Sequence, residues 1–176
     1  MSPRVTAPPT RPPASAVERD DLAVGRRVDL YLHPGQVFAS RCPARVTTVL
    51  GSCVAVCLWD RHSAVGGINH YLLPDGAADG PSPLRFGSVA TPALIDEILA
   101  LGAHRSGLQA KVFGGACIAV AFRGQGKRHL GAANVQSALA TLAAAGIPVE
   151  ARDTEGRRGR KLVFQTDGGS AWVKPL

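Results

Sequence analysis

Two apolar runs that follow each other closely constrain the fold most. The first covers residues 46–59 and is interrupted only at residues 50–52, and the second covers residues 65–73 and ends at a Pro-Asp-Gly turn. A polar turn, residues 60–63, separates the two runs. Short apolar runs bounded by turn residues are typical of buried strands. We therefore predict a β-hairpin, with the first run as a central strand of its sheet.

Further strands and two helices are predicted around this hairpin. Thr91-Pro92 predicts a helix start, with threonine as the N-cap and proline in the first turn, and Gly102 predicts its end. A second helix is predicted over residues 132–145, ending at Gly146. Short strands are predicted at residues 28–32, 111–115, 117–122, 149–151, 161–165 and 171–174. This order predicts the α/β class, with mixed, mostly antiparallel β-sheets packed against helices.

The N-terminal segment differs in composition from the rest of the chain. Residues 1–26 are rich in proline and arginine and poor in large apolar side chains, so we predict a flexible tail followed by one domain over residues 27–176. The tail contains no apolar block typical of a signal peptide, and no stretch reaches the ~20 apolar residues of a membrane-spanning helix. We therefore expect a cytoplasmic protein whose four cysteines are thiols.

The hairpin brings a thiol and an imidazole together. A turn centred between Arg61 and His62 places Cys53 directly opposite His70, with Cβ atoms about 4.5–5.5 Å apart on one face. Such a pair suits acyl transfer at an amide or ester, because a neighbouring imidazolium lowers the pKa of the thiol and then protonates the leaving group. A register shift of one residue moves His70 to the other face.

Residues close to Cys53 complete this hypothesis. Gly51-Ser52 allows a tight turn that exposes the sulfur and leaves backbone N–H groups available for an oxyanion. Thr47 or Thr48, earlier on the same run, is placed to hydrogen-bond the second imidazole nitrogen and fix its tautomer.

The other cysteines are interpreted differently. Cys57 and Cys117 lie within apolar runs and are read as core residues. A zinc site built from Cys53, Cys57 and His70 is the less favoured alternative, because the Cys-x2-Cys spacing and a second ligand pair are missing. We expect no metal and no cofactor.

The chain carries a formal net charge of +7, which raises the question of nucleic acid or acidic protein partners. Arg157, Arg158, Arg160 and Lys161 form a basic cluster, but aromatic residues are not interleaved with it and make up only 5% of the chain. No phosphate-binding glycine motif is present. We therefore interpret the cluster as a solvated turn or a docking surface for an acidic protein, and expect no nucleic acid partner.

Residues 47–60, TTVLGSCVAVCLWD, and residues 66–74, GGINHYLLP, resemble the signature of the CheD family of chemotaxis proteins. The resemblance extends over roughly residues 28–176. It implies a cysteine hydrolase that deamidates selected glutamines of methyl-accepting chemotaxis receptors to glutamate, on a fold similar to toxin-type cysteine deamidases. Receptors, and a phosphatase of the CheC type, are the implied partners.

The resemblance also implies residue roles. Cys53 matches the nucleophile, His70 the general base and acid, and Thr47 the third catalytic position, with Thr48 as a less favoured substitute. The chain departs from the family where many members have Gly-Glu-Arg-Asn, because residues 131–134 read Gly-Ala-Ala-Asn. A non-catalytic adaptor that binds receptors or a phosphatase is the alternative function.

Overall fold

The computed structural model describes residues 27–118 and 129–176. The predicted tail, residues 1–26, lies outside the described residues, as does most of the strand predicted at 117–122, so the division into tail and domain stays a prediction. Within the described part of the chain, no helix is long and apolar enough to cross a membrane.

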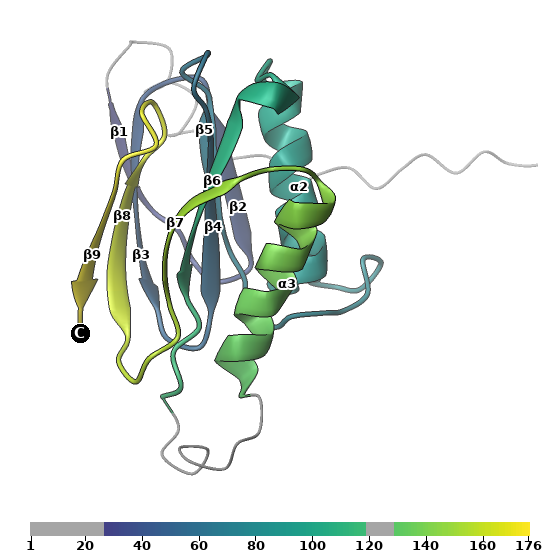
Figure 1. Cartoon of the computed structure of the whole chain (residues 1–176), viewed down its shortest axis with the longest axis vertical. Coiled ribbons are helices and arrows are strands. Elements are labelled where there is room, and N and C mark those ends of the chain that lie inside the picture. The colour runs from purple at the N-terminus through teal and green to yellow at the C-terminus, as the bar shows by residue number, and fades with distance from the viewer. Residues whose placement is uncertain (1–26, 119–128) are drawn as a thin grey trace, which may run out of the picture.

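Two sheets and a pair of helices stack in three layers (Figure 1). A four-stranded sheet has the order β1-β3-β8-β9, and a five-stranded sheet has the order β2-β5-β4-β6-β7 and carries both helices on its other face. The prediction of the α/β class with mostly antiparallel sheets is thereby confirmed. The elements are β1 Val28–Tyr31, β2 Gln36–Ser40, β3 Ala44–Leu50, β4 Val54–Asp60, β5 Gly66–His70, η1 Pro83–Arg85, α2 Gly87–Ala100, η2 Arg105–Gly107, β6 Leu108–Gly114, α3 Leu130–Ala144, β7 Val149–Thr154, β8 Arg160–Gln165 and β9 Ala171–Pro175.

Strand β4 lies at the centre of the molecule, and every one of its residues is buried. Its alternate side chains belong to two separate cores: Val54, Val56 and Leu58 pack under the helices, while Ala55 and Cys57 pack between the two sheets. The predicted central strand 46–59 is corrected in one respect. It forms two strands, β3 and β4, because the break at residues 51–53 carries the chain from one sheet to the other.

The predicted hairpin β4–β5 is present, but its register differs from the prediction. Cys57 pairs with Ile68, and Asp60 pairs with Val65 through an N–H···O bond of 2.9 Å, instead of facing Ser63. The wider loop forms because two of its groups donate hydrogen bonds to the buried Asp60 carboxylate: the His62 N–H, and the Ser63 hydroxyl at 2.7 Å. The register therefore shifts by two residues. A shift of two keeps each side chain on its face, whereas a shift of one reverses it.

Helix α2 begins a turn earlier than Thr91-Pro92 predicts. The backbone N–H groups of Gly87 and Ser88 donate to the carbonyls that follow β5, at 2.8 and 2.9 Å, and so satisfy the first turn without a side-chain cap. A Cβ at Gly87 would lie 2.6 Å from the ring of Tyr71, so only glycine allows this approach. Helix α3 begins two residues before the predicted start and ends at Ala144, two residues before Gly146, which has a φ of +69°.

Candidate active site

His70 is the last residue of β5, and its side chain is buried, with only 1% of its surface exposed. Its carbonyl accepts a hydrogen bond of 2.7 Å from the N–H of Gly35, the residue before the neighbouring strand β2. Its ring reaches the other sheet, where Nδ1 lies 2.8 Å from Oγ1 of Thr48 on β3. The imidazole is therefore held from both sheets.

The partners of the Thr48 hydroxyl determine the tautomer of this ring. The hydroxyl donates its only proton to the hydrogen bond with the carbonyl of Leu32, at 2.8 Å, so it must accept a hydrogen bond from His70 Nδ1–H. Nε2 is consequently the unprotonated nitrogen. It is buried and has no hydrogen-bond partner among the described residues. In this arrangement His70 Nε2 has a free lone pair and can accept a proton.

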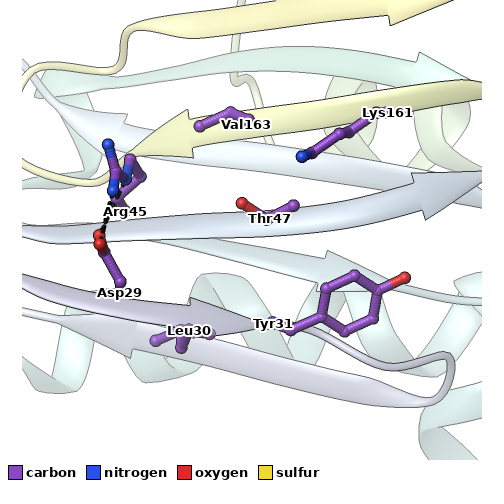
Figure 2. Close-up of a pocket in the computed structure, with 7 residues that line it drawn as sticks. All are labelled: Asp29, Leu30, Tyr31, Arg45, Thr47, Lys161 and Val163. Carbon is purple, nitrogen blue, oxygen red and sulfur yellow. Dashed lines mark hydrogen bonds and ion pairs between the residues drawn. The ribbon is translucent and has the colours of Figure 1, made fainter.

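Thr47 takes no part in this contact. The side chains of β3 alternate, so Thr48 points into the space between the sheets and Thr47 points to the outer face. There Thr47 lines a shallow pocket of about 470 Å³ together with Asp29, Tyr31 and Lys161 (Figure 2). Of the two alternatives that the sequence left open for the contact with the imidazole, the geometry selects Thr48. The catalytic role that the resemblance implies for Thr47 stays a prediction.

Cys53 lies in the loop between β3 and β4, and its side chain is partly exposed. Two carbonyl groups of this loop accept hydrogen bonds that fix its position: Gly51 O accepts from Ala116 N–H at 2.7 Å, and Cys53 O accepts from Gly115 N–H at 2.8 Å. These donors follow β6, where Gly114 has a φ of +107° and a Cβ would lie 2.2 Å from Cys53 O. Glycine at 114 is therefore required for the loop to dock.

Asn134, in the second turn of α3, joins the Cys53 loop to the segment after His70. Its buried side-chain nitrogen Nδ2 donates to the carbonyl of Ser52 at 2.8 Å and to the carbonyl of Leu72 at 2.9 Å. Sequence reasoning did not identify this residue. The only signal was that asparagine is retained where residues 132–133 depart from the family pattern.

Cys53 and His70 lie on the same face of the β4–β5 pair, but they are not directly opposite each other. The observed register, extended from the bridge between Val54 and Tyr71, places His70 opposite Ala55. Cys53 packs against the core between the sheets, on the side of β4 that also carries Ala55. Among the described residues, no hydrogen bond joins the Cys53 thiol to His70.

The protonation states in this site differ from the expected ion pair. Burial raises the pKa of the Cys53 thiol above its ordinary value, against the smaller effect of its own backbone N–H. Burial also lowers the pKa of His70 to about 4, although the Leu32 carbonyl opposes the shift. At neutral pH both groups are uncharged, so the expectation that an imidazolium activates the resting thiol is corrected.

Other residues singled out in the sequence have structural positions. Cys57 is fully buried between the sheets, so its interpretation as a core residue is confirmed. Cys117 is only partly buried. No group of three His, Cys, Asp or Glu side chains in the described part of the chain is placed to hold a metal ion.

The basic cluster divides into two parts. Arg157 and Arg158 are exposed in the turn between β7 and β8, whereas Arg160 is only 6% exposed. The Arg160 guanidinium binds the carboxylate and carbonyl of Asp153 and the carbonyl of Glu155. Arg160 therefore holds this turn together and is not available for docking.

Comparison with known proteins agrees with the sequence pattern. The family model described as CheD chemotactic sensory transduction matches residues 72–175. A protein of Anaeromyxobacter dehalogenans named "Probable chemoreceptor glutamine deamidase CheD 1" is 52% identical over 152 residues, covering 86% of this chain and 87% of that protein. The chain belongs to the CheD family. A Rhodospirillum rubrum protein of the same family name is 42% identical over 146 residues, covering 83% of this chain and 81% of that protein.

The resemblance to the family is thus confirmed, and the two alignments cover enough of the chain that they must include residues 47–70. Among solved structures, the Neisseria meningitidis protein NMB0706 aligns with a TM-score of 0.45 and 13% identity, covering 80% of this chain and 68% of that one.

Proposed function

We propose that this chain is a cytoplasmic chemoreceptor glutamine deamidase that hydrolyses the side-chain amide of selected receptor glutamines to glutamate and ammonia. The names of its relatives support the substrate and the reaction. The observation that carries the mechanism is the hydrogen bond between Thr48 and His70, which leaves a buried basic nitrogen in the site that also contains the Cys53 loop.

The first step starts from a neutral thiol and a neutral imidazole. His70 Nε2 accepts the thiol proton as Cys53 Sγ forms a bond to the carboxamide carbon, so the thiolate exists only while the substrate is bound. The low pKa of His70 keeps this nitrogen unprotonated at neutral pH. Charge that develops on the amide oxygen is placed near the backbone N–H of Cys53, which already interacts with its own sulfur.

The second half of the reaction returns the proton and consumes water. The His70 imidazolium gives its proton to the departing nitrogen, so that the C–N bond breaks, ammonia leaves and a thioester remains. His70 then accepts a proton from water as the water oxygen attacks the thioester carbon. His70 returns this proton to Sγ as the C–S bond breaks, so that the receptor glutamate is released and the Cys53 thiol is regenerated. Each step uses only groups of this chain and water.

Two further side chains position the reacting groups without touching the substrate. Thr48 holds the Nδ1–H tautomer of His70. Asn134 fixes the carbonyl of Ser52, and because the peptide unit is planar and trans, the N–H of Cys53 points the opposite way from that carbonyl. Asn134 therefore orients the proposed oxyanion donor.

Mass spectrometry of a purified receptor cytoplasmic fragment, incubated with the protein, tests this proposal. Each deamidated glutamine gains about 1 Da, and we expect the gain to disappear with Cys53→Ala, because the nucleophile is removed. Cys57→Ala is the control, since it makes the same truncation at a cysteine of β4 that is buried in the core. Per amount of folded protein, Cys57→Ala should still deamidate the receptor fragment, because its nucleophile is retained.

Deamidation that persists with Cys53→Ala refutes the nucleophile assignment. If the wild-type protein binds the receptor fragment but deamidates no glutamine, the adaptor alternative is favoured instead. A partner phosphatase of the CheC type stays a prediction.

A further inference from the structure

The outer face of the four-stranded sheet is not covered by any element of the described chain (Figure 1). Soluble proteins seldom leave large apolar side chains grouped on such a face without a use for them. Six large hydrophobic side chains of the described residues are exposed, and three of them lie on this face: Tyr31 at 48%, Val49 at 42% and Trp172 at 53%. A fourth, Leu176, follows the last strand.

One row of side chains crosses all four strands of this face. Tyr31 pairs with Thr47, Thr47 with Val163, and Val163 with Trp172, so an aromatic ring stands at each end of the row. Three strand spacings separate the two rings, which is about 14 Å. An α-helix with its side chains is about 10–12 Å wide. Thr47 and Val163 form the floor of the shallow pocket in Figure 2, between these two edges.

The neighbouring row carries positive charge. Val49 pairs with Lys161, and Lys161 stands directly opposite Lys174 on β9. Like charges in directly opposed positions destabilise a sheet. Among the described residues no carboxylate pairs with either ammonium group, because Asp29, the acidic residue of this face, is bonded to Arg45 at 2.8 Å (Figure 2).

We propose that this outer face, defined by Tyr31, Thr47, Lys161, Val163, Trp172 and Lys174, docks an acidic amphipathic helix of a partner protein. The apolar side of the helix lies between the two aromatic rings, and its carboxylates neutralise the two lysines. Tyrosine and tryptophan are the side chains that contribute most at protein interfaces. Because Thr48 and His70 lie on the opposite side of β3, this surface is independent of the proposed catalytic reaction.

Charge and spacing argue against other occupants. A second copy of this chain, docked through the same face, would add two more lysines to the interface, while the Asp29 carboxylate of each copy is already bonded to Arg45. Residues 1–26 have four arginines against three acidic residues, so they offer no net negative charge to the two lysines. Single-stranded nucleic acid stacks successive bases on closely spaced rings, whereas these rings are separated by a threonine and a valine.

Fluorescence of Trp172 tests the proposal on the full-length protein. The probe is a synthetic helical peptide with leucines on one side and glutamates elsewhere, and the comparison probes are the same peptide with lysines in place of glutamates and an oligo(dT) strand. We expect the acidic peptide alone to shift the emission to shorter wavelength, because Trp172 becomes buried, while Trp59 is buried already. The affinity should fall as the salt concentration rises.

Two double variants with the same change of charge provide the decisive comparison. Lys161→Glu with Lys174→Glu should weaken peptide binding about tenfold or more, because two charge contacts are reversed. Arg157→Glu with Arg158→Glu changes two exposed side chains in the adjoining turn and should weaken it by no more than about twofold. Both should retain wild-type deamidase activity on a receptor fragment, so that this test and that of the catalytic proposal fail separately.

Four outcomes would overturn the docking proposal. They are equal loss of affinity in the two double variants, a preference for oligo(dT), a blue shift that grows with protein concentration in the absence of peptide, and no response to the acidic peptide at all.

Discussion

Thr48→Val is the substitution that tests the geometry around the imidazole most directly. Valine has the shape of threonine but replaces the hydroxyl by a methyl group, so the contacts of β3 with its neighbours are kept. Two hydrogen bonds are lost, to His70 Nδ1 and to the carbonyl of Leu32, both of 2.8 Å. The Nδ1–H tautomer loses its acceptor, and the ring is no longer held with Nε2 as the base.

The size of the effect follows from the burial of these groups. A buried donor left without an acceptor costs about 1–3 kcal/mol. If this cost falls on the reactive tautomer, the rate decreases by about five- to 150-fold, and we expect a loss of kcat of about tenfold to a hundredfold. KM should stay within about twofold, because Thr48 is buried and cannot contact the receptor. Thr48→Ser restores the hydroxyl and should recover most of the rate.

The assay measures initial rates of ammonia release from a receptor fragment, with thermal unfolding recorded for each variant. Thr47→Val is the matched control, since it makes the same replacement at the adjacent residue on the outer face. It should leave kcat within about twofold. Our reasoning is refuted if Thr47→Val lowers kcat as much as Thr48→Val, or if Thr48→Val has no effect while both proteins remain folded.

Two further predictions concern stability and the loop of the nucleophile. Asn134→Ala removes both Nδ2 hydrogen bonds, so we expect a loss of about 2–5 kcal/mol in unfolding free energy and a drop in kcat. Urea unfolding and activity assays measure both effects, and Ala133→Ser, on the same helix turn, is the control. Equal losses in the two variants would contradict the role of Asn134. His70 has its pKa lowered to about 4 from an unfolded value near 6.5, so its contribution to stability is complete above pH ~6.5 and is lost as the pH falls to about 4. Wild type should lose up to about 3 kcal/mol over this range relative to His70→Gln in urea unfolding, and parallel pH profiles of the two proteins would contradict the shift.

Local patterns predicted the parts of the site that depend on neighbouring residues. The hairpin, and the face shared by Cys53 and His70, follow from the spacing of apolar residues and polar turns, and they tolerate the observed register shift because it is an even number of residues. The choice between Thr47 and Thr48 was also readable. Arg45 shares its face with Thr47, and a charged residue in that position indicates the outward side of a strand.

Other parts depend on contacts between distant segments. Asn134 lies 82 positions from Ser52, and nothing in its helix indicates which carbonyl groups it binds. The loop of the hairpin is widened by Asp60, whose carboxylate also accepts a bond from His104 N–H in a segment that approaches only in the folded chain. The resting charges of Cys53 and His70 depend on burial by both sheets, which the local sequence does not express.

The alternation of β4 between two cores has a consequence for the tolerance of this protein to mutation. Substitutions that disturb the packing under the helices shift β4 through its contacts at Val56 and Leu58. Substitutions that disturb the packing between the sheets shift it through Ala55 and Cys57. Because Cys53 directly precedes this strand, either kind of error displaces the nucleophile. A deep mutational scan for deamidation should therefore find sensitive positions in both layers that flank β4, at residues such as Leu94 and Phe164 that never meet a substrate.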